Sequence, residues 1–333
     1  MYKSKWIQIT LSASLLMMSS ALVAQAATKS WVSSNGGGVT CSRALPCATF
    51  QIAHDATTPG GEINCVDAGD YGQVIITKAI SIVCENTEAS IVAVTSGITV
   101  NAGPTDVVTL RGIDIEGNGA GLQGINFAHG AALHIFKVHI RNFRNNNPAT
   151  AGILFQPNAY AELYVADSYI TDNGGSGAFS GGIVLRPFDN GRGNVIINRV
   201  LLENNAVGIV AAPGPISNGS AMNVIVRDSV VTGSAGDGIA GVSGAGQAAV
   251  SIFVEGCMLS TNFGSGISVN GAAMSGVGSV TARIGNTTIA HNVTGASAVG
   301  GGVLQSFKNN QIFANLSDGT PITAVPAPGG PLQ

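Results

Sequence analysis

Residues 182–209 read GIVLRPFDNGRGNVIINRVLLENNAVGI, and this stretch spans one complete period of a repeat. It begins and ends on glycine followed by a β-branched aliphatic residue. The same pair recurs at spacings of 26 to 36 residues, by subtraction of the positions Gly97-Ile98, Gly124-Ile125, Gly152-Ile153, Gly182-Ile183, Gly208-Ile209, Gly238-Ile239, Gly266-Ile267 and Gly302-Val303. A recurrence in this range is typical of a solenoid, in which each repeat buries its apolar face against its neighbours.

Each repeat contains two short strand patterns. The first follows the glycine, as in GILFQ at 152–156, where alternate residues are apolar. The second comes later, as in LYVADSYI at 163–170, which is rich in β-branched and aromatic residues and has turn residues around it. No repeat has a helical period. The pattern therefore predicts an all-β solenoid and argues against leucine-rich, ankyrin and helical-pair repeats.

A column of asparagines supports stacked turns. The residue three positions after the last apolar residue of each second strand is asparagine in six of eight repeats: Asn118, Phe143, Asn173, Asn205, Ser234, Asn262, Asn292 and Asn315. Asparagine is common in isolated tight turns, because its side chain can bond the nearby backbone and it tolerates a left-handed conformation. The fixed register goes further and predicts equivalent turns in which each amide bonds the next, an asparagine ladder.

The start of the chain has the pattern of a signal peptide. Lys3 and Lys5 precede an apolar stretch at 7–23, and Ala24-Gln25-Ala26 has the small-x-small form of a cleavage site. An uncleaved anchor is the alternative, but polar residues interrupt the stretch. We expect residues 1–26 to be removed, the mature chain to be exported to the periplasm or the extracellular space, and no membrane span to remain.

The composition limits the classes of partner that we expect. Charged residues make up only 10% of the 333 residues and the net charge is -3, so we expect no nucleic-acid partner.

The sequence also divides the chain into regions. We expect an N-terminal cap region at 27–60, with a helix at 48–57, because the end of a solenoid core needs covering. The repeats then occupy 61–318, and a flexible tail rich in Pro and Gly follows at 319–333.

Five cysteines agree with export. Cys41–Cys47 and Cys65–Cys84 are the simplest pairing in an oxidising compartment. A metal site is the rival interpretation, but the spacing is not C-x-x-C and no histidine is close in sequence. Cys257 falls on an inward position of its strand, so we expect a buried free thiol.

One segment resembles a known family. GGEINCVDAGDYGQVIITKAISIVC at 60–84 follows the expected helix and precedes Gly-Ile coils with turn asparagines. This arrangement is similar to the start of right-handed parallel β-helix proteins, the pectate-lyase-like superfamily. The resemblance covers roughly residues 30–318 and is strongest to secreted bacterial β-helix proteins known mainly from sequence. It implies a right-handed parallel β-helix with a short N-terminal capping helix, and no settled activity.

Motifs of the enzymes in that superfamily are absent. The sequence has no counterpart of the N-T-D, D-D, G-H-G and R-I-K motifs of polygalacturonases, nor of the Q-A-V-A-L and D-F-I-F-G motifs of pectin methylesterases. Calcium prefers clustered carboxylates, and the 18 acidic residues here are dispersed. We therefore expect no metal and no cofactor, and a Ca²⁺ site is unsupported.

One outward patch combines several reactive groups. Asp114, His139 and Tyr169 form one column across adjacent repeats, beside Glu116 and Arg141. Paired charges on neighbouring strands usually stabilise the scaffold, and we favour that interpretation. The alternative is that the patch binds an acidic sugar or performs β-elimination, with Arg141 or His139 as base and Tyr169 as acid.

Further binding candidates lie elsewhere. Gln156 and Arg186 follow first strands of adjacent repeats. Tyr160, Tyr164 and Tyr169 cluster in one repeat and are expected to form the best surface for stacking on sugars, although packing at the edge of the core is the more common role of such residues. We favour a non-catalytic scaffold that binds a polysaccharide or a cell-surface component. A lyase or epimerase acting on uronate glycans is the alternative, and a structural or adhesive element is the third.

Overall fold

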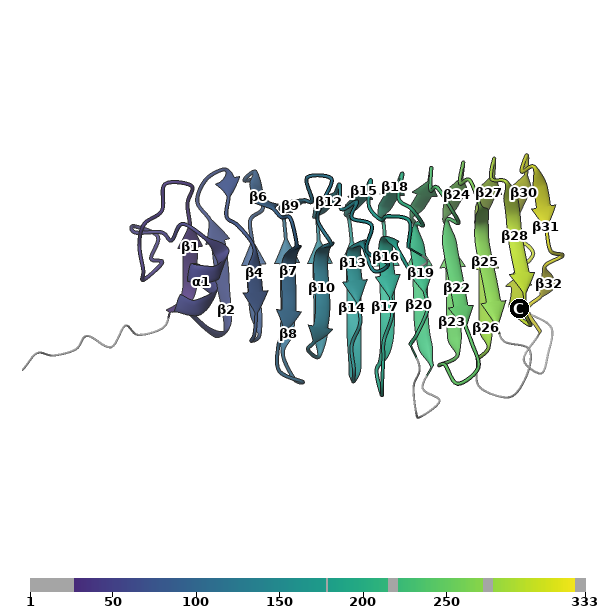
Figure 1. Cartoon of the computed structure of the whole chain (residues 1–333), viewed down its shortest axis with the longest axis horizontal. Helices are drawn as coiled ribbons and strands as arrows, with labels where there is room; N and C mark the ends of the chain where they lie inside the picture. Colours follow the sequence, from purple (N-terminus) through teal and green to yellow (C-terminus); the bar gives the residue numbers. More distant parts are fainter. Residues whose placement is uncertain (1–26, 178, 215–220, 272–277, 327–333) are drawn as a thin grey trace, which may run out of the picture.

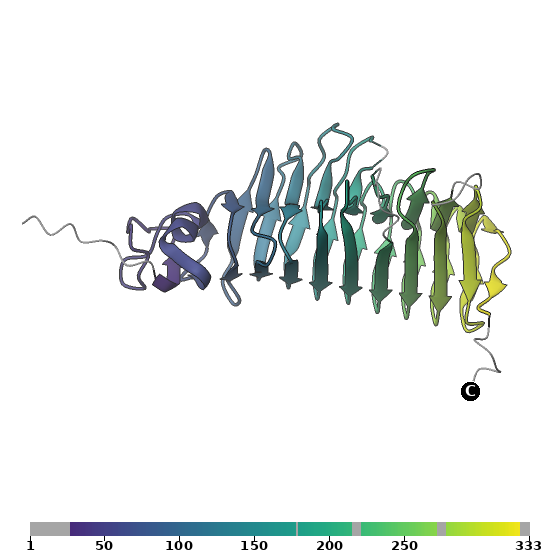
Figure 2. The same cartoon turned by 90° about the horizontal axis from the view of Figure 1, so that it is seen from below.

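The chain winds into an elongated stack of coils, seen from the side in Figures 1 and 2. This computed structural model describes residues 27–177, 179–214, 221–271 and 278–326, so the expected signal peptide at 1–26 lies outside the described residues. Successive coils add parallel strands to three sheets. The prediction of an all-β parallel solenoid is confirmed. Its right-handed sense stays a prediction.

Sheet 1 has twelve strands, and its order follows the chain along the stack. They are β1 (Ala27–Val32), β2 (Thr57–Cys65), β5 (Ile80–Val83), β8 (Val107–Arg111), β11 (Ala132–Phe136), β14 (Tyr160–Ala166), β17 (Arg192–Asn198), β20 (Met222–Arg227), β23 (Val250–Glu255), β26 (Val280–Gly285), β29 (Val303–Ser306) and β32 (Thr323–Ala324).

Sheets 2 and 3 have ten strands each. Sheet 2 consists of β4 (Val74–Ile76), β7 (Ser96–Asn101), β10 (Gln123–His129), β13 (Ala151–Phe155), β16 (Gly181–Leu185), β19 (Ile209–Ala211), β22 (Ile239–Ser243), β25 (Ser265–Gly271), β28 (Thr294–Val299) and β31 (Ser317–Gly319). Sheet 3 consists of β3 (Gly69–Asp70), β6 (Ala89–Val92), β9 (Ile113–Glu116), β12 (His139–Arg141), β15 (Tyr169–Thr171), β18 (Leu201–Glu203), β21 (Val230–Thr232), β24 (Met258–Ser260), β27 (Thr288–Ala290) and β30 (Gln311–Phe313).

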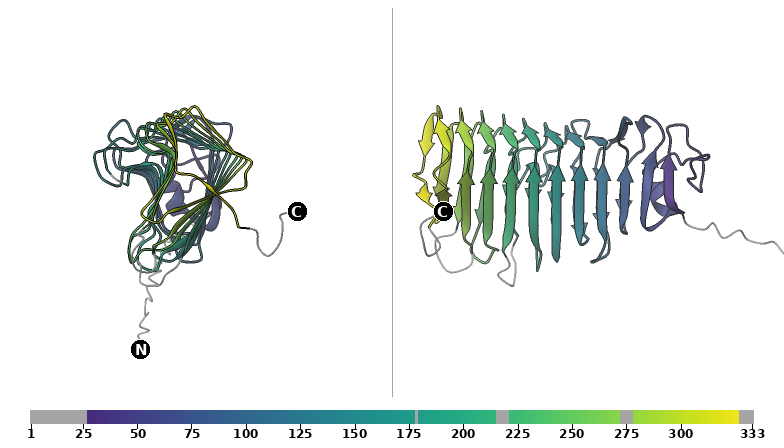
Figure 3. Two further views of the ribbon diagram at one scale, coloured as in Figure 1. Left: turned by 90° about the vertical axis from the view of Figure 1, so that its right-hand side faces the viewer. Right: turned by 180° about the vertical axis from the view of Figure 1, so that it is seen from behind.

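The three sheets enclose one apolar interior, and the end-on view in Figure 3 shows the coils superposed around it. In-register pairing stacks like residues: Ile115, Ile140 and Ile170 lie on consecutive strands of sheet 3 and are fully buried. Strand side chains alternate between the two faces, so the residues on either side of each isoleucine point outward. The buried columns therefore fix which side chains the outer face of sheet 3 presents.

The two ends of the stack differ from the expected boundaries. Helix α1 (Phe50–Ala56) lies within the helix expected at 48–57, begins after the N-cap Thr49 and contacts β1, β2 and β4. However, β1 and the start of β2 fall within the expected cap region 27–60 and already belong to sheet 1. At the other end, β32 falls within the expected tail and pairs with β29.

Among the described residues, no helix is long and apolar enough to cross a membrane.

Both expected disulfides form, and the fifth cysteine is free. Cys41 bonds Cys47, and Cys65 bonds Cys84. Cys257 is 4% exposed. Burial raises the pKa of its thiol to about 11, so it is protonated and unreactive at neutral pH.

The asparagine ladder forms inside the stack. The side-chain oxygen of Asn205 accepts from the backbone N–H of Asn173 at 2.9 Å, and its amide donates to the carbonyl of Ile170 at 2.8 Å. Asn262, Asn292 and Asn315 repeat this arrangement. Three members of the column depart from it: Phe143 fills its position with a buried ring, Ser234 has no amide, and Asn118 is exposed. In the coils from Phe143 onward the left-handed backbone falls on the residue before the column position, such as Asn204 with φ 53°, whereas Asn118 is itself left-handed.

The recurring glycine gives the ladder its space. A Cβ on Gly182 would lie 2.8 Å from the carbonyl oxygen of Gly208 and 3.0 Å from the amide of Asn205. Gly152, Gly238 and Gly266 face a ladder amide at similarly short distances. Repeat glycine and turn asparagine are thus two parts of one packing unit.

Ser234 leaves a gap in this ladder. Its hydroxyl is buried without a hydrogen-bond partner among the described residues, between Asn205 and Asn262. We expect Ser234→Asn to place an amide where it accepts from the N–H of Asn205 and donates to the carbonyl of Leu202. The gain should be about 1 kcal/mol in free energy of unfolding, measured by chemical denaturation. Ser234→Ala is the control and adds no bond. A loss of stability in Ser234→Asn would contradict the ladder explanation.

Candidate functional site

A groove of about 700 Å³ lies on the outer face of sheet 3, near the N-terminal end of the stack. Its floor is formed by β6, β9 and β12, and segment 84–88 forms one wall. The Cys65–Cys84 disulfide anchors the start of this wall. We call this hollow the sheet 3 groove. The charged and imidazole side chains that line it are Glu85, Glu88, Asp114, Glu116, Lys137, His139 and Arg141.

Strand register places the charges of the groove. β9 reads IDIE and β12 reads HIR, so their isoleucines point inward and the other side chains outward. His139 lies opposite Asp114, and Arg141 lies opposite Glu116. On the next strand Tyr169 lies opposite His139, with ring centroids 6.1 Å apart. The structure thus brings together the four catalytic candidates and Glu116.

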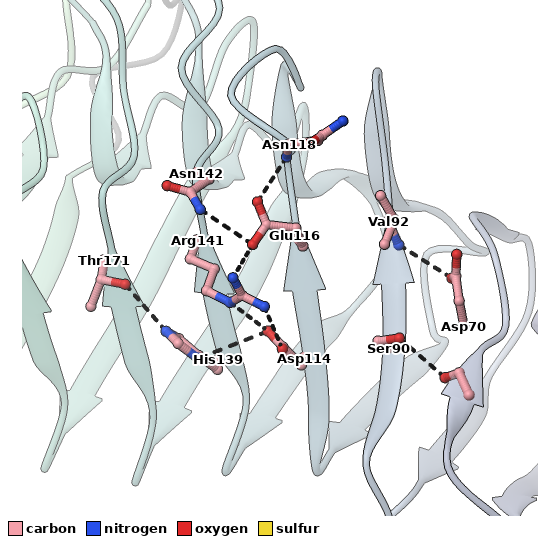
Figure 4. Close-up of polar contacts among 11 residues, drawn as sticks. Asp70, Ser90, Val92, Asp114, Glu116, Asn118, His139, Arg141, Asn142 and Thr171 are labelled. Carbon is pink, nitrogen blue, oxygen red and sulfur yellow. Dashed lines mark hydrogen bonds and ion pairs between the residues drawn. The ribbon is translucent and has the colours of Figure 1, made fainter.

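Arg141 is fully engaged by carboxylates, as Figure 4 shows. Its Nε and Nη2 donate to the two oxygens of Asp114 at 3.2 and 2.9 Å, and its Nη1 contacts Oε2 of Glu116. The backbone N–H of Asn118 and the amide of Asn142 also donate to Glu116. The hydrogen bond with Asp114 is the main cause that raises the pKa of Arg141. A guanidinium held in this way is a poor general base.

His139 is the remaining candidate base. Its Nε2 lies 3.2 Å from the hydroxyl of Thr171, and its Nδ1 lies 3.8 Å from the carboxylate of Asp114. Burial lowers the pKa of His139 below its usual value, and the opposing effect of Asp114 is smaller. The imidazole is therefore neutral at neutral pH. A neutral ring with one side toward the groove can exchange hydrogen bonds with a bound hydroxyl.

Sequence reasoning missed the wall of the groove. Glu85 accepts from Lys137 at 2.7 Å and from Arg111 at 3.1 Å, and these bonds hold its pKa below the usual range. Lys137 is 52 positions away in the sequence, so no local motif announces the pair. The Cys65–Cys84 bridge was the available signal that this segment is fixed. We found no side-chain hydrogen bond for Glu88 within the described ranges.

The other binding candidates lie outside the sheet 3 groove. Tyr160 and Tyr164 are on β14 of sheet 1 while Tyr169 is on β15 of sheet 3, so the expected single surface of three tyrosines is wrong. The reason is the turn after Ala166, which carries the chain from sheet 1 to sheet 3 between the two strands. At the end of sheet 2, Gln156 donates to Asn126 at 3.0 Å, and the guanidinium of Arg186 lies 4.3 Å from the centre of the Phe179 ring.

No arrangement of metal ligands is present in the described part of the chain, where no group of three or more His, Cys, Asp or Glu side chains could hold an ion. Asp114 and Glu116 already neutralise Arg141. The expectation that the protein uses no cofactor stays a prediction.

Comparisons with known proteins give the fold. No family model and no curated protein matches the chain. The solved structure of pectate lyase Pel9A is 14% identical, with a TM-score of 0.52 over 87% of this chain and 79% of that one. The Dettilon tailspike protein (gp208) is 11% identical, with a TM-score of 0.45 over 84% and 55%. The A-module of the mannuronan C-5 epimerase AlgE6 from Azotobacter vinelandii is 13% identical, with a TM-score of 0.33 over 84% and 94%.

The likeness to Pel9A is high enough to show a shared fold and too low in identity to show an activity. The chain therefore has the parallel β-helix fold of pectate-lyase-like proteins, as the resemblance of its sequence predicted.

Proposed function

We propose that this parallel β-helix protein is exported and binds a neutral polysaccharide in the sheet 3 groove without cleaving it. The observation that carries the proposal is the contact of all three guanidinium nitrogens of Arg141 with Asp114 and Glu116, in a groove that has no surplus of positive charge. Two disulfides in a chain of this size are consistent with an oxidising, extracytoplasmic location.

The charge balance of the groove disfavours a polyuronate ligand. Four carboxylates line it, from Glu85, Glu88, Asp114 and Glu116, against the two cations of Lys137 and Arg141, which leaves two negative charges. Arg111 contacts Glu85 from sheet 1 and reduces this excess to one. Like charges repel, so a polyanionic chain gains no electrostatic attraction here. This balance also weakens the lyase and epimerase alternative, which requires neutralisation of a uronate.

The groove offers the groups that bind hydroxyls. His139, Ser90, Asn86 and Thr87 line it together with the carboxylates, and side chains of this kind donate to and accept from sugar hydroxyls. The groove is open rather than enclosed, and strands with the same spacing continue on sheet 3 beyond it. A long polymer can therefore lie across several coils, as expected for a solenoid surface.

A blocking substitution tests the groove. Ser90→Trp places an indole on the groove floor, at the position paired with Asp114. We expect it to lower the affinity for neutral polysaccharide at the groove at least tenfold, measured by affinity electrophoresis in gels containing galactomannan or xyloglucan. The matched control is Thr288→Trp, in the same outward column of sheet 3 at the far end of the stack. The control should bind as the unmodified protein does.

Two outcomes contradict the proposal. Equal affinities of Ser90→Trp and the unmodified protein would show that the groove is not the site. Release of unsaturated product from polygalacturonate or alginate, lost in Arg141→Ala, would establish the lyase alternative instead.

A further inference from the structure

The two ends of the stack are closed to different degrees. At the N-terminal end helix α1 packs against the first strands, as Figure 2 shows, and Phe50 of the helix and Val32 of β1 are fully buried. The outer edge of β1 is also occupied, because the backbone of Trp31 bonds Cys41 and Cys47 at 2.8 and 2.9 Å. At the C-terminal end, no helix and no further strand of the described chain lies beyond β30, β31 and β32.

Three strand edges are therefore open at the C-terminal end. β30 pairs with β27, β31 with β28 and β32 with β29, and none of the three has a second strand partner among the described residues. The backbone N–H and C=O groups of an open edge are a template for another strand, and proteins often protect such edges with charged side chains. Here residues 292–326 contain only two charged side chains, Lys308 and Asp318.

The apolar core also opens at this end. In the inward column of sheet 3, Ile289 is fully buried, whereas Ile312, next in register, is only half-buried. Beside it Phe313 is 50% exposed, and Leu316 in the following turn is 86% exposed. We call the surface formed by β30, β31 and β32 with these three apolar side chains the C-terminal face. Exposed apolar side chains next to open strand edges are typical of a contact surface.

Two candidates for the partner of the C-terminal face are disfavoured. The N-terminal end of another copy offers no open strand, because the edge of β1 is already bonded to segment 41–47. The sequence that follows the described residues, APGGPLQ at 327–333, has proline at two positions and glycine at two more. Proline has no N–H to donate to a strand edge, and both residues are unfavourable within strands.

We infer that the protein forms a dimer through the C-terminal faces of two copies, with the stacks end to end and related by a two-fold axis. A second C-terminal face offers the open strand edges and apolar side chains that the first one lacks. An axis perpendicular to an edge strand sets that strand antiparallel to its copy, so backbone hydrogen bonds can continue the sheet across the contact. Lys308 and Asp318 balance each other in charge, so the face does not repel a copy of itself.

The dimer leaves the sheet 3 groove free. The groove lies near the N-terminal end of the stack, so the two grooves of a dimer lie at its far ends. The inference therefore goes beyond the proposed function and does not depend on it.

Sedimentation velocity of the mature protein tests the contact. We expect a dimer at about 100 μM that dissociates on dilution. Leu316→Asp should raise the dissociation constant about tenfold or more, because the contact would bury an unpaired carboxylate. Leu316 is exposed in the single chain, so the melting temperature of the monomer should not change. The matched control is Val39→Asp, an apolar residue at the N-terminal end that is 81% exposed, and it should leave the dissociation constant unchanged.

Four outcomes overturn the dimer. The first is an unmodified protein that stays monomeric at about 100 μM. The second is a dimer whose dissociation constant Leu316→Asp does not change. The third is a series of oligomers that grows beyond two copies and is disrupted by Val39→Asp, which would show a head-to-tail contact. The fourth is loss of the dimer in Ser90→Trp, which would place the contact at the groove. A Ser90→Trp protein that still dimerises but no longer binds polysaccharide supports both proposals, and one that dimerises with unchanged affinity for polysaccharide supports the dimer while the groove proposal fails.

Discussion

Asn205→Ala should destabilise the protein by about 3 kcal/mol. Asn205 is fully buried, and its side-chain amide makes two hydrogen bonds to the backbone of the preceding coil. Its loss leaves the N–H of Asn173 without the acceptor at 2.9 Å and the carbonyl of Ile170 without the donor at 2.8 Å. Each buried group left unpaired costs about 1–3 kcal/mol, and the cavity adds to this.

Chemical denaturation of the mature protein measures this cost. The matched control is Asn118→Gly, because Asn118 belongs to the same sequence column but is exposed, and glycine readily adopts its backbone φ of 50°. The control should change the free energy of unfolding by less than about 0.5 kcal/mol. An Asn205→Ala protein as stable as the control would show that asparagine at this position reflects turn preference alone.

The fold was predictable because the repeat makes each structural requirement visible many times. One Gly-Ile pair says little, but seven in register on sheet 2 reveal that a Cβ is excluded, and the close approach of Gly208 to Gly182 supplies the physical reason. The eighth predicted pair was wrong, because Val303 belongs to sheet 1 and Ala296 takes the position in register with Ile267. The asparagine column was predictable for the same cause. The first and last strands of the stack were not predictable. β1 pairs with only one neighbouring strand of its sheet, and β32 consists of two exposed residues with no alternation of apolar side chains.

The candidate site was predictable only where strand register decides it. Asp114, His139, Arg141, Glu116 and Tyr169 were brought together by counting along repeats, and the pairing follows that count. The wall of the groove depends instead on a turn whose path no repeat fixes. In the same way, Tyr160 and Tyr169 are near in sequence, but a turn moves them to different sheets.

Removal of the Cys65–Cys84 bridge should cost about 3 kcal/mol in free energy of unfolding, because the bond closes a sequence separation of 19 residues and restricts the unfolded chain. The substitutions are Cys65→Ala and Cys84→Ala together, which avoid burying a new polar group at the position of Cys84, 2% exposed. Loss of Cys41–Cys47, with a separation of 6, is the control and should cost only about 2 kcal/mol on the same argument.

The double variant Cys65→Ala, Cys84→Ala should also lower binding at the sheet 3 groove. Residue 84 begins the wall that carries Glu85, and Glu85 bonds Lys137 and Arg111 across it. Without the bridge this wall is held at its start only by packing and backbone bonds, so affinity for neutral polysaccharide at the sheet 3 groove should fall. Loss of Cys41–Cys47 should leave that affinity unchanged, because neither cysteine lines the groove. Denaturation of both variants and affinity electrophoresis under native conditions separate the two effects. A Cys65→Ala, Cys84→Ala protein that unfolds at the same denaturant concentration as the unmodified chain would show that the bridge does not stabilise the fold, and one with unchanged affinity would show that the bridge does not fix the wall.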